Sequence, residues 1–358
     1  MKGLILSGGK GTRLRPLTYT RAKQLIPLAN VPVLVRVIET IRNAGVTEIG
    51  IVVGGSTAAE IETTLGDGSE WGVELTFIHQ ESPDGLAHAV KISEDFLQDD
   101  PFVMFLGDNA IEGGISQLIQ DFDKHDWNSQ IVLKRVENPS SYGVASLNAD
   151  GSIDYLVEKP IDPPSDLALV GIYMFDHNVF KAVNAIKPSD RGELEITDAI
   201  QWLIHNDYTV FPHVHEGWWV DTGKAPDLLE ANSYVLSELE PNIADSASID
   251  EASTVDARVT VQEGAKIINS VVRGPTVIGK NAVIEDSYIG PFTSIYHDVT
   301  VKNCEIERSI LLEESTVKDI DVMLRDSLIG RNAQVKSNRD MKPRGVVMNV
   351  ADNSSLWI

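Results

Sequence analysis

The sequence predicts an α/β domain with a mostly parallel sheet over residues 1–240, followed by a parallel β-helix over residues 241–358. Three observations predict this organisation. The chain has 358 residues, which is ample for two domains with cores of their own. Its first part alternates short apolar runs with amphipathic stretches. Its last part repeats apolar residues at a step of six.

The α/β prediction starts from an apolar strand at Lys2–Leu6. Further strand-like runs lie at Glu48–Gly54, Val73–Ile78, Phe102–Asp108, Ile131–Val136 and Ala168–Phe175. Stretches with apolar residues at three- and four-residue steps lie between them, at Val33–Ala44, Leu86–Leu97 and Leu194–Asn206. Alternation of strands and helices predicts a mostly parallel sheet with helices on both faces.

The β-helix prediction depends on two series of apolar residues. One series is Ile243, Ile249, Val255, Val261 and Ile267, and the other is Val271, Val277, Val283, Ile289, Ile295 and Val301. A six-residue step fits neither an α-helix nor a simple strand, but it is typical of hexapeptide coils that place one apolar residue inward per short strand. These residues are therefore expected in the core. Residues 345–358 are expected to close one end or to contact a neighbouring chain.

The net charge is extreme, because 30 Lys and Arg face 53 Asp and Glu, giving −23. Nucleic acids and anionic membranes bind basic surfaces, so neither is expected as a partner. The acidic residues are spread along the whole chain. We expect a surface adapted to high salt, and an ordinary acidic cytosolic protein is the alternative.

Other features predict the cytoplasm as the compartment. No apolar run reaches 18 residues, and the N-terminus lacks the layout of a signal peptide. The single cysteine, Cys304, cannot form an internal disulfide, which favours a reducing compartment.

The loop after the first strand combines glycines with positive charge. It contains Gly8, Gly9, Gly11, Thr12, Arg13 and Arg15, and Lys23 follows ten residues after Arg13. Glycines let backbone N–H groups approach an anion, and Arg and Lys add charge at the same place. The pattern is neither a Walker A loop nor a dinucleotide fingerprint. It indicates a polyphosphate site, with a tight turn as the plainer alternative.

Two aspartates are candidate metal ligands. Asp108 follows a buried strand, and the carboxyl ends of such strands face the crevice where α/β ligands bind. Asp221 lies in the aromatic segment Trp218–Gly223. Phosphate chemistry between anions calls for a divalent ion, and Mg2+ prefers carboxylates plus substrate oxygens. A turn or helix-capping role remains the alternative for each.

A third group of residues ends other strands. Glu158 and Lys159 precede Pro160, which forces an extended or turning backbone at Lys159. This pair lines a pocket or forms a surface ion pair. The acidic residues of Arg191–Asp198 are candidate helix N-terminal charges. Tyr142-Gly143 and Val170-Gly171 place glycines where backbone can approach a ligand.

Together these segments resemble the sugar-1-phosphate nucleotidylyltransferases, and most closely the members that transfer thymidylyl groups to glucose 1-phosphate. The matching segments are Ser7–Thr18, Ala22–Pro27, Pro83–Ala89, Leu106–Asn109, Val157–Pro160, Arg191–Ile200 and Trp218–Gly223. They follow the family's order. The resemblance implies a Rossmann-like catalytic domain and, for the long form, a left-handed hexapeptide β-helix.

The resemblance also implies a role for each site residue. The implied nucleotide-binding residues are Leu6, Gly8, Gly9, Gly11, Thr12, Arg13, Lys23, Gln24, Gln80, Gly85 and Asp108. The implied sugar-phosphate-binding residues are Asn109, Tyr142, Gly143, Glu158, Lys159 and Gly171. Arg13, Lys23, Asp108 and Lys159 are the implied catalytic residues, and Asp108 and Asp221 the implied Mg2+ ligands. Ser7 departs from the Ala that is commoner in the family, and His88 is assigned no role.

The implied reaction is dTTP plus glucose 1-phosphate giving dTDP-glucose and pyrophosphate, in a homo-oligomer. Three alternatives remain open at this point: a UTP-dependent enzyme, a non-catalytic nucleotide-sugar-binding regulator, and acyl transfer by the β-helix. His297 is the residue that the last alternative would use.

Overall fold

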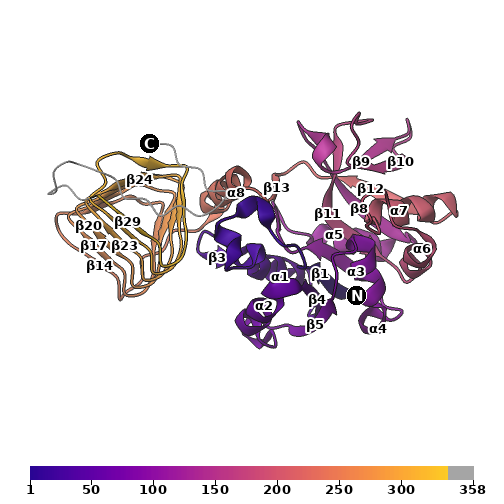
Figure 1. Cartoon of the computed structure of the whole chain (residues 1–358), viewed down its shortest axis with the longest axis horizontal. Coiled ribbons are helices and arrows are strands. Elements are labelled where there is room, and N and C mark those ends of the chain that lie inside the picture. Colours follow the sequence, from indigo (N-terminus) through magenta and orange to yellow (C-terminus); the bar gives the residue numbers. More distant parts are fainter. Residues whose placement is uncertain (338–358) are drawn as a thin grey trace. The chain divides into compact units, whose positions relative to one another are not determined.

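The protein, described here by a computed structural model over residues 1–337, contains two compact units (Figure 1). The first unit consists of Met1–Lys10, Arg21–Leu25 and Val33–Asp221. The second consists of Gly11–Thr20, Ile26–Pro32 and the chain from Thr222 onward. The expectation for residues 345–358 falls outside the described residues. According to these ranges, the chain crosses between the two units within residues 10–33.

Within residues 1–337, the largest sheet lies in the first unit and has nine strands. They are β1 (Lys2–Leu6), β4 (Glu48–Gly54), β5 (Glu74–Gln80), β6 (Phe102–Leu106), β8 (Ser129–Arg135), β9 (Gly143–Leu147), β10 (Ile153–Glu158), β11 (Leu167–Phe175) and β12 (Val210–Val214). Strands β5, β4, β1 and β6 are neighbours in that order and run parallel. Strand β11 pairs antiparallel with β6, β8 and β9. The sheet is thus mixed, and the loops after β1, β5 and β6 leave the same edge of its parallel part.

Helices cover both faces of this sheet, as the alternating pattern predicts. They are α1 (Val33–Asn43), α2 (Ala58–Leu65), α3 (Leu86–Ile92), α4 (Glu94–Leu97), α5 (Ser116–Lys124), α6 (Val179–Ala185) and α7 (Ile196–His205). A Cβ atom on Gly3 would lie 3.1 Å from Ile41 of α1, so Gly3 faces that helix. Its neighbour Leu4 faces the opposite way, into a core formed with residues of α3, α6 and α7.

The stretch Leu86–Leu97 is two helices, not the single one predicted. Helix α3 ends before Ser93 and α4 begins after it. The Ser93 hydroxyl is buried and donates to the carbonyl of Ala89 at 2.7 Å. Such a bond competes with the backbone ladder of the helix, and the sequence periodicity carries no sign of it.

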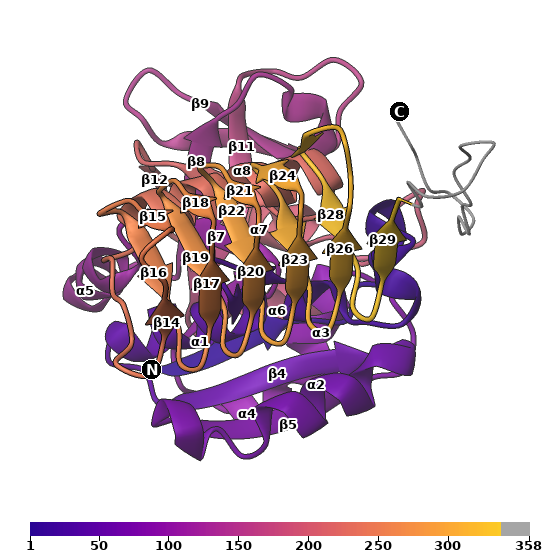
Figure 2. The ribbon, with the colours of Figure 1, turned by 90° about the vertical axis from the view of Figure 1, so that its left-hand side faces the viewer.

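The second unit contains a parallel β-helix whose short strands stack into three sheets over the described residues (Figure 2). One sheet contains β14 (Ser248–Ile249), β17 (Lys266–Ile268), β20 (Val283–Glu285), β23 (Thr300–Lys302), β26 (Thr316–Lys318) and β29 (Gln334–Lys336). The next contains β15 (Thr254–Val255), β18 (Val271–Val272), β21 (Tyr288–Ile289), β24 (Glu305–Glu307) and β27 (Leu324–Arg325). The third contains β16 (Val259–Val261), β19 (Thr276–Ile278), β22 (Thr293–Ile295), β25 (Ile310–Leu311) and β28 (Leu328–Ile329). The hexapeptide prediction is confirmed at the level of architecture, but Ile243, the first residue of the first series, is 50% exposed and does not belong to the core.

The register of the second apolar series is wrong by one residue at its start. The core contains Val272, Ile278 and Ile284, and each of them pairs with a core residue of the next coil. The predicted Val271 and Val283 are only half-buried. Val272 pairs with Ile289, so this coil closes in 17 residues, not in three steps of six. Stacking of inward side chains between coils decides the register, and a fixed sequence step does not capture it.

Cys304 belongs to a ladder of small side chains inside the β-helix. The Ser287 backbone N–H donates to the Ser270 hydroxyl at 3.0 Å, and the Cys304 N–H donates to the Ser287 hydroxyl at 3.2 Å. Burial raises the pKa of the Cys304 thiol. The cysteine is therefore a packed core residue, held in the unreactive thiol form.

Helix α8 (Ala225–Glu238) and the hairpin of β2 (Pro27–Leu28) and β3 (Val31–Pro32) are also part of the second unit. The fully buried Asn232 of α8 accepts from the Ala29 N–H at 2.8 Å and from the Ser294 hydroxyl at 2.8 Å. Asn30 donates to the Ile295 carbonyl at 2.7 Å. These buried hydrogen bonds explain why a hairpin from the N-terminal part of the sequence packs with the β-helix.

Candidate functional site

The expected site residues are divided between the two units. The first unit contains Leu6, Gly8, Gly9, Lys23, Gln24, Gln80, Gly85, Asp108, Asn109, Tyr142, Gly143, Glu158, Lys159, Gly171 and Asp221. The second unit contains Gly11, Thr12 and Arg13. Each group is described within its own unit.

Lys23 and Asp108 form the centre of the group in the first unit. Asp108 follows β6 after one glycine, is 7% exposed, and forms an ion pair with the Lys23 ammonium. The Asn109 side chain donates to the other Asp108 carboxylate oxygen at 3.1 Å. A Cβ atom on Gly9 would lie 3.2 Å from the Lys23 nitrogen, so this glycine leaves room for the ammonium group. The glycine loop and the candidate metal ligand thus meet at Lys23.

Asp221 is next to this centre because two short strands pair. Strand β13 (Trp219–Asp221) runs antiparallel to β7 (Asn109–Ile111), with Asp221 opposite Asn109. The Trp219 indole donates to the Asn109 side chain at 2.7 Å, which fixes the pairing. Asp221 therefore lies opposite the residue that follows Asp108, although the two aspartates are more than a hundred residues apart in sequence.

The two aspartates fit a Mg2+ site. Within the described residues there is no cluster of three or more His, Cys, Asp or Glu side chains that could hold a metal. Mg2+ is commonly bound by one or two carboxylates and completes its octahedron with water and substrate phosphates. A pair of hard oxygen donors beside a lysine and a glycine loop has this chemistry.

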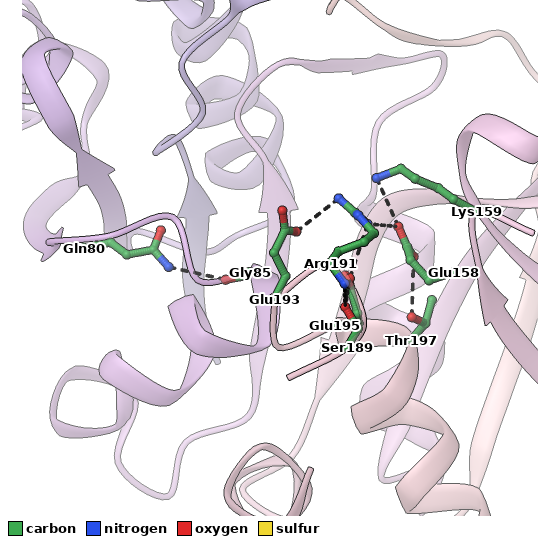
Figure 3. Close-up of polar contacts among 9 residues, drawn as sticks. All are labelled: Gln80, Gly85, Glu158, Lys159, Ser189, Arg191, Glu193, Glu195 and Thr197. Carbon is green, nitrogen blue, oxygen red and sulfur yellow. Dashed lines mark hydrogen bonds and ion pairs between the residues drawn. The ribbon is translucent and has the colours of Figure 1, made fainter. Parts of the chain in front are cut away.

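The loop after β5 forms a second part of the site. Gln80 ends β5, and its side-chain nitrogen lies 3.3 Å from the carbonyl oxygen of Gly85 (Figure 3). Its side-chain oxygen would lie 3.2 Å from a Cβ atom on Gly8. Gly85 has φ of +106°, and a Cβ atom there would lie 2.7 Å from the Leu194 backbone nitrogen. Gly85 is thus required by its backbone conformation and by this close approach.

Two residues expected around the base are buried under the glycine loop. Gln24 is 1% exposed and donates to the carbonyl of Ser7 at 3.1 Å. Its side-chain oxygen is buried and has no hydrogen-bond partner within the described residues. Leu6 is 7% exposed and belongs to the core cluster of the sheet. In this structure both residues support the end of β1.

Glu158 organises the third part of the site. It ends β10 opposite Gly143 on β9, and one carboxylate oxygen contacts Lys159 at 3.2 Å and Arg191 at 3.3 Å (Figure 3). The Thr197 hydroxyl lies 3.4 Å from the other oxygen. Two cations therefore converge on a single carboxylate at the end of this sheet.

The backbone conformation around Glu158 determines where Lys159 and the neighbouring glycines lie. Lys159 has φ of +42°, in the left-handed region, so the chain turns sharply before Pro160. A Cβ atom on Gly143 would lie 2.7 Å from the Thr197 methyl group, and one on Gly171 would lie 2.5 Å from the Cδ1 atom of Leu106. Both glycines are accounted for by close packing beside the candidate site.

Arg191 is a site residue that the sequence interpretation missed. Its guanidinium contacts Glu193 at 3.2 Å and Glu195 at 3.2 Å, in addition to Glu158 (Figure 3). Burial raises the pKa of the Glu195 carboxyl, which also accepts from the Ser189 hydroxyl at 2.9 Å. The sequence alone predicts only helix N-terminal charge for the run Arg191–Asp198. Its contact with the distant Glu158 arises only in the fold.

An aromatic pair links the two charged groups. The Tyr142 ring meets the Trp219 ring edge to face, with centroids 5.3 Å apart. The Lys159 N–H also donates to the Tyr142 carbonyl at 3.0 Å. Tyr142 thus connects the aspartate pair, through Trp219, with the turn that carries Lys159.

The part of the loop in the second unit has its own geometry. Gly11 has φ of +62°, and its carbonyl accepts from the Thr18 hydroxyl at 2.6 Å. Arg13 follows on the exposed side of a short 3-10 turn. Burial raises the pKa of Asp227 in α8, and the positive charges of Lys224 and Arg13 partly counteract this effect.

Comparison with known proteins places these features in a family. The nucleotidyl transferase family model matches residues 2–238. A glucose-1-phosphate thymidylyltransferase of Streptomyces antibioticus is 50% identical over 94% of this chain and 93% of its own length. A low-salt glycan biosynthesis nucleotidyltransferase of Haloferax volcanii is 45% identical over 99% of both chains.

A solved structure agrees with these sequence matches. The crystal structure of a putative glucose-1-phosphate thymidylyltransferase from Bacillus anthracis with sucrose has a TM-score of 0.62 and 35% identity. The match covers 65% of this chain and 94% of that one. The first strand, the glycine loop and the aspartate pair all fall within the matched family region, and the chain belongs to the nucleotidyl transferase family.

Proposed function

We propose that this protein transfers a thymidylyl group from dTTP to α-D-glucose 1-phosphate, giving dTDP-glucose and pyrophosphate. The observation that carries the proposal is the likeness, over nearly its whole length, to the Streptomyces antibioticus enzyme. The geometry supports the same chemistry, because Lys23 pairs with Asp108 just beyond the end of a strand of the parallel sheet, and Asp221 lies opposite the neighbouring Asn109.

The attacking atom is a phosphate oxygen of glucose 1-phosphate. This phosphate is largely ionised at neutral pH, since its second pKa is about 6. No general base is therefore required. The main barrier is repulsion between two anions, and a unit pair 4 Å apart costs roughly 4 kcal/mol at an effective dielectric of about 20.

The protein's cations offset this repulsion. Lys159 and Arg191, which share Glu158 in the structure, bind the sugar phosphate. Lys23 binds the triphosphate together with the backbone of Gly8 and Gly9 in the first unit. The family resemblance suggests phosphate binding for Gly11, Thr12 and Arg13 as well. With the attacking phosphate oxygen and the leaving pyrophosphate on opposite sides of the α-phosphorus, the new P–O bond forms as the bond to pyrophosphate breaks.

Asp108 and Asp221 would hold Mg2+, which would supply positive charge where the phosphate oxygens bind. Within the protein, Asp108 also keeps Lys23 beside Gly9, and Asn109 orients the Asp108 carboxylate. These contacts preorganise the phosphate site before the substrates arrive.

The remaining assignments complete the two pockets. The base lies against Leu6, Gln80 and Gly85, with Gln24 supporting the loop from below. The glucose lies between Tyr142, Gly143, Glu158, Gly171 and Asn109. Gln80 takes this role because its side-chain oxygen faces Gly8, where no side chain blocks the approach, and Gly85 is held beside Gln80 by a hydrogen bond.

The same proposal covers the organisation of the chain. We propose residues 1–240 as the catalytic domain and residues 241–358 as the β-helix domain, whose strands are described up to Lys336 and which associates with copies of itself into a homo-oligomer. Within the described residues no helix is long and apolar enough to span a membrane. The single cysteine supports the reducing cytoplasm as the compartment.

The acidic surface is proposed as an adaptation to high salt. With a net charge of −23, self-repulsion destabilises the compact state in dilute buffer, and at 1 M salt screening acts over about 3 Å. We expect both the melting temperature and turnover to rise from dilute buffer to molar KCl. Full activity and stability without added KCl, with no gain on addition, would contradict this adaptation.

The proposed reaction is tested by measuring pyrophosphate release from dTTP in the presence of glucose 1-phosphate and Mg2+, with the sugar product identified by mass. Reactions that lack either substrate are the controls. Stoichiometric dTDP-glucose and pyrophosphate are expected, and binding of both substrates without turnover would favour a non-catalytic regulator instead.

A further inference from the structure

His88 contacts the residue proposed to bind the base. It lies in the first turn of α3, and its ring nitrogen Nδ1 is 3.0 Å from the side-chain nitrogen of Gln80. The same Gln80 nitrogen lies 3.3 Å from the Gly85 carbonyl (Figure 3). Neither the reaction mechanism nor the family resemblance assigns His88 a role.

The chemistry of these three groups fixes the direction of the hydrogen bonds. A carboxamide nitrogen only donates and a backbone carbonyl only accepts, so Nδ1 of His88 must be the acceptor. The ring is then neutral and carries its proton on Nε2. Both N–H bonds of Gln80 are used, one by His88 and one by Gly85.

This arrangement decides which end of the Gln80 carboxamide is left for a ligand. The oxygen faces Gly8, where a Cβ atom would be only 3.2 Å away, and Gly8 has no side chain to cover it. Rotating the carboxamide by 180° would place its oxygen against the Gly85 carbonyl, which can only accept, and would break the bond that Nδ1 accepts in this tautomer. The two contacts therefore hold Gln80 with its acceptor directed at the glycine loop.

We propose that His88 is a positioning residue for base selection, which holds the Gln80 carboxamide so that its oxygen accepts from the N3–H of the pyrimidine. Thymine and uracil carry this N–H. N3 of cytosine is an acceptor, so it cannot form a hydrogen bond with the Gln80 oxygen. The inference rests on the proposed function and adds the reason why Gln80 prefers one class of pyrimidine.

The test compares His88→Leu and His88→Asn with the unchanged protein. Leucine has no acceptor, so the Gln80 carboxamide can rotate, whereas the Asn oxygen stands close to the position of Nδ1 and can accept the same bond. His79→Leu is the matched control, because His79 lies beside Gln80 on β5 but its side chain is 64% exposed and contacts Glu62 at 3.1 Å.

For His88→Leu we expect KM for dTTP to rise by about tenfold, because one oriented hydrogen bond is lost. The preference for dTTP over dCTP in kcat/KM should fall by a similar factor, while kcat and KM for glucose 1-phosphate stay unchanged. His88→Asn should restore both the KM and the preference, and His79→Leu should alter neither.

The proposal is overturned if His88→Leu keeps the KM and the preference of the unchanged protein, or if both substrates are affected alike. It is also overturned if a folded His88→Asn protein loses the preference, which covers the case in which His88→Leu does not fold. Failure of the proposed function is recognised separately, since the unchanged protein would then release no pyrophosphate from dTTP or UTP.

Discussion

Replacing Asp108 with Asn lowers kcat by about two to three orders of magnitude and leaves the fold intact. The substitution keeps the size of the side chain and its ability to accept from Asn109 at the position now 3.1 Å away. It removes the negative charge that holds Lys23 and that we assign to Mg2+. Steady-state pyrophosphate release, measured over a Mg2+ titration, gives kcat and the dependence on the ion.

Asp123→Asn is the matched control for this prediction. Asp123 lies on α5 and is exposed, so its loss changes the net charge equally without touching the candidate site. Both variants should keep the melting temperature within a few degrees. Turnover by the Asp108→Asn protein close to that of the control would show that this carboxylate is not part of the catalytic site.

Replacing Arg13 with Ala lowers kcat/KM for dTTP by about a hundredfold to a thousandfold. Arg13 is exposed on a 3-10 turn just after Gly11, so truncation removes a planar fork of donors from the loop without opening a cavity. Arg13→Lys should recover part of the loss, because Lys supplies the charge but not bidentate geometry. Initial rates over a dTTP series separate effects on KM from effects on kcat.

Lys10→Ala separates the role of Arg13 from the general positive charge of the loop. Lys10 is exposed in the same segment and carries the same charge. We expect the Lys10 variant to remain within a few-fold of the unchanged protein. Equal losses in the two variants would mean that the loop attracts the nucleotide by its summed charge, and the assignment of a specific contact to Arg13 would be withdrawn.

Local sequence signals predicted the elements that carry the site. The first strand is Lys2–Leu6 as expected, and α1 begins at Val33 as the apolar periodicity indicates. Asp108 lies just beyond the end of a strand next to β1, which is where the strand pattern placed it. These features are recoverable because strand ends and amphipathic faces are local properties of the sequence.

Contacts between distant segments were not predictable from one sequence. The opposition of Asp221 to Asn109 depends on the pairing of β13 with β7, and the contact of Arg191 with Glu158 depends on where α7 meets β10. The packing of Asn30 on Ile295 is a further example. Periodicity identifies each segment, but tertiary hydrogen bonds determine which segments meet.

The β-helix shows the same limit within a repeat. A regular step of six predicts the coil, yet the core at the start of the second series is built from Val272 and Ile284 instead of Val271 and Val283. Adjacent apolar residues made either register plausible from the sequence. Only the stacking of Val272 under Ile289 distinguishes them.

The central claim is that the protein makes dTDP-glucose, and kcat/KM for pyrophosphate release over a panel of nucleotides tests it most directly. The panel pairs dTTP, UTP, dCTP and ATP with glucose 1-phosphate, and dTTP with other sugar 1-phosphates. We predict the highest kcat/KM for dTTP with glucose 1-phosphate, with dTDP-glucose as the product. A higher kcat/KM for UTP, or no pyrophosphate from dTTP with any sugar phosphate, would contradict the claim.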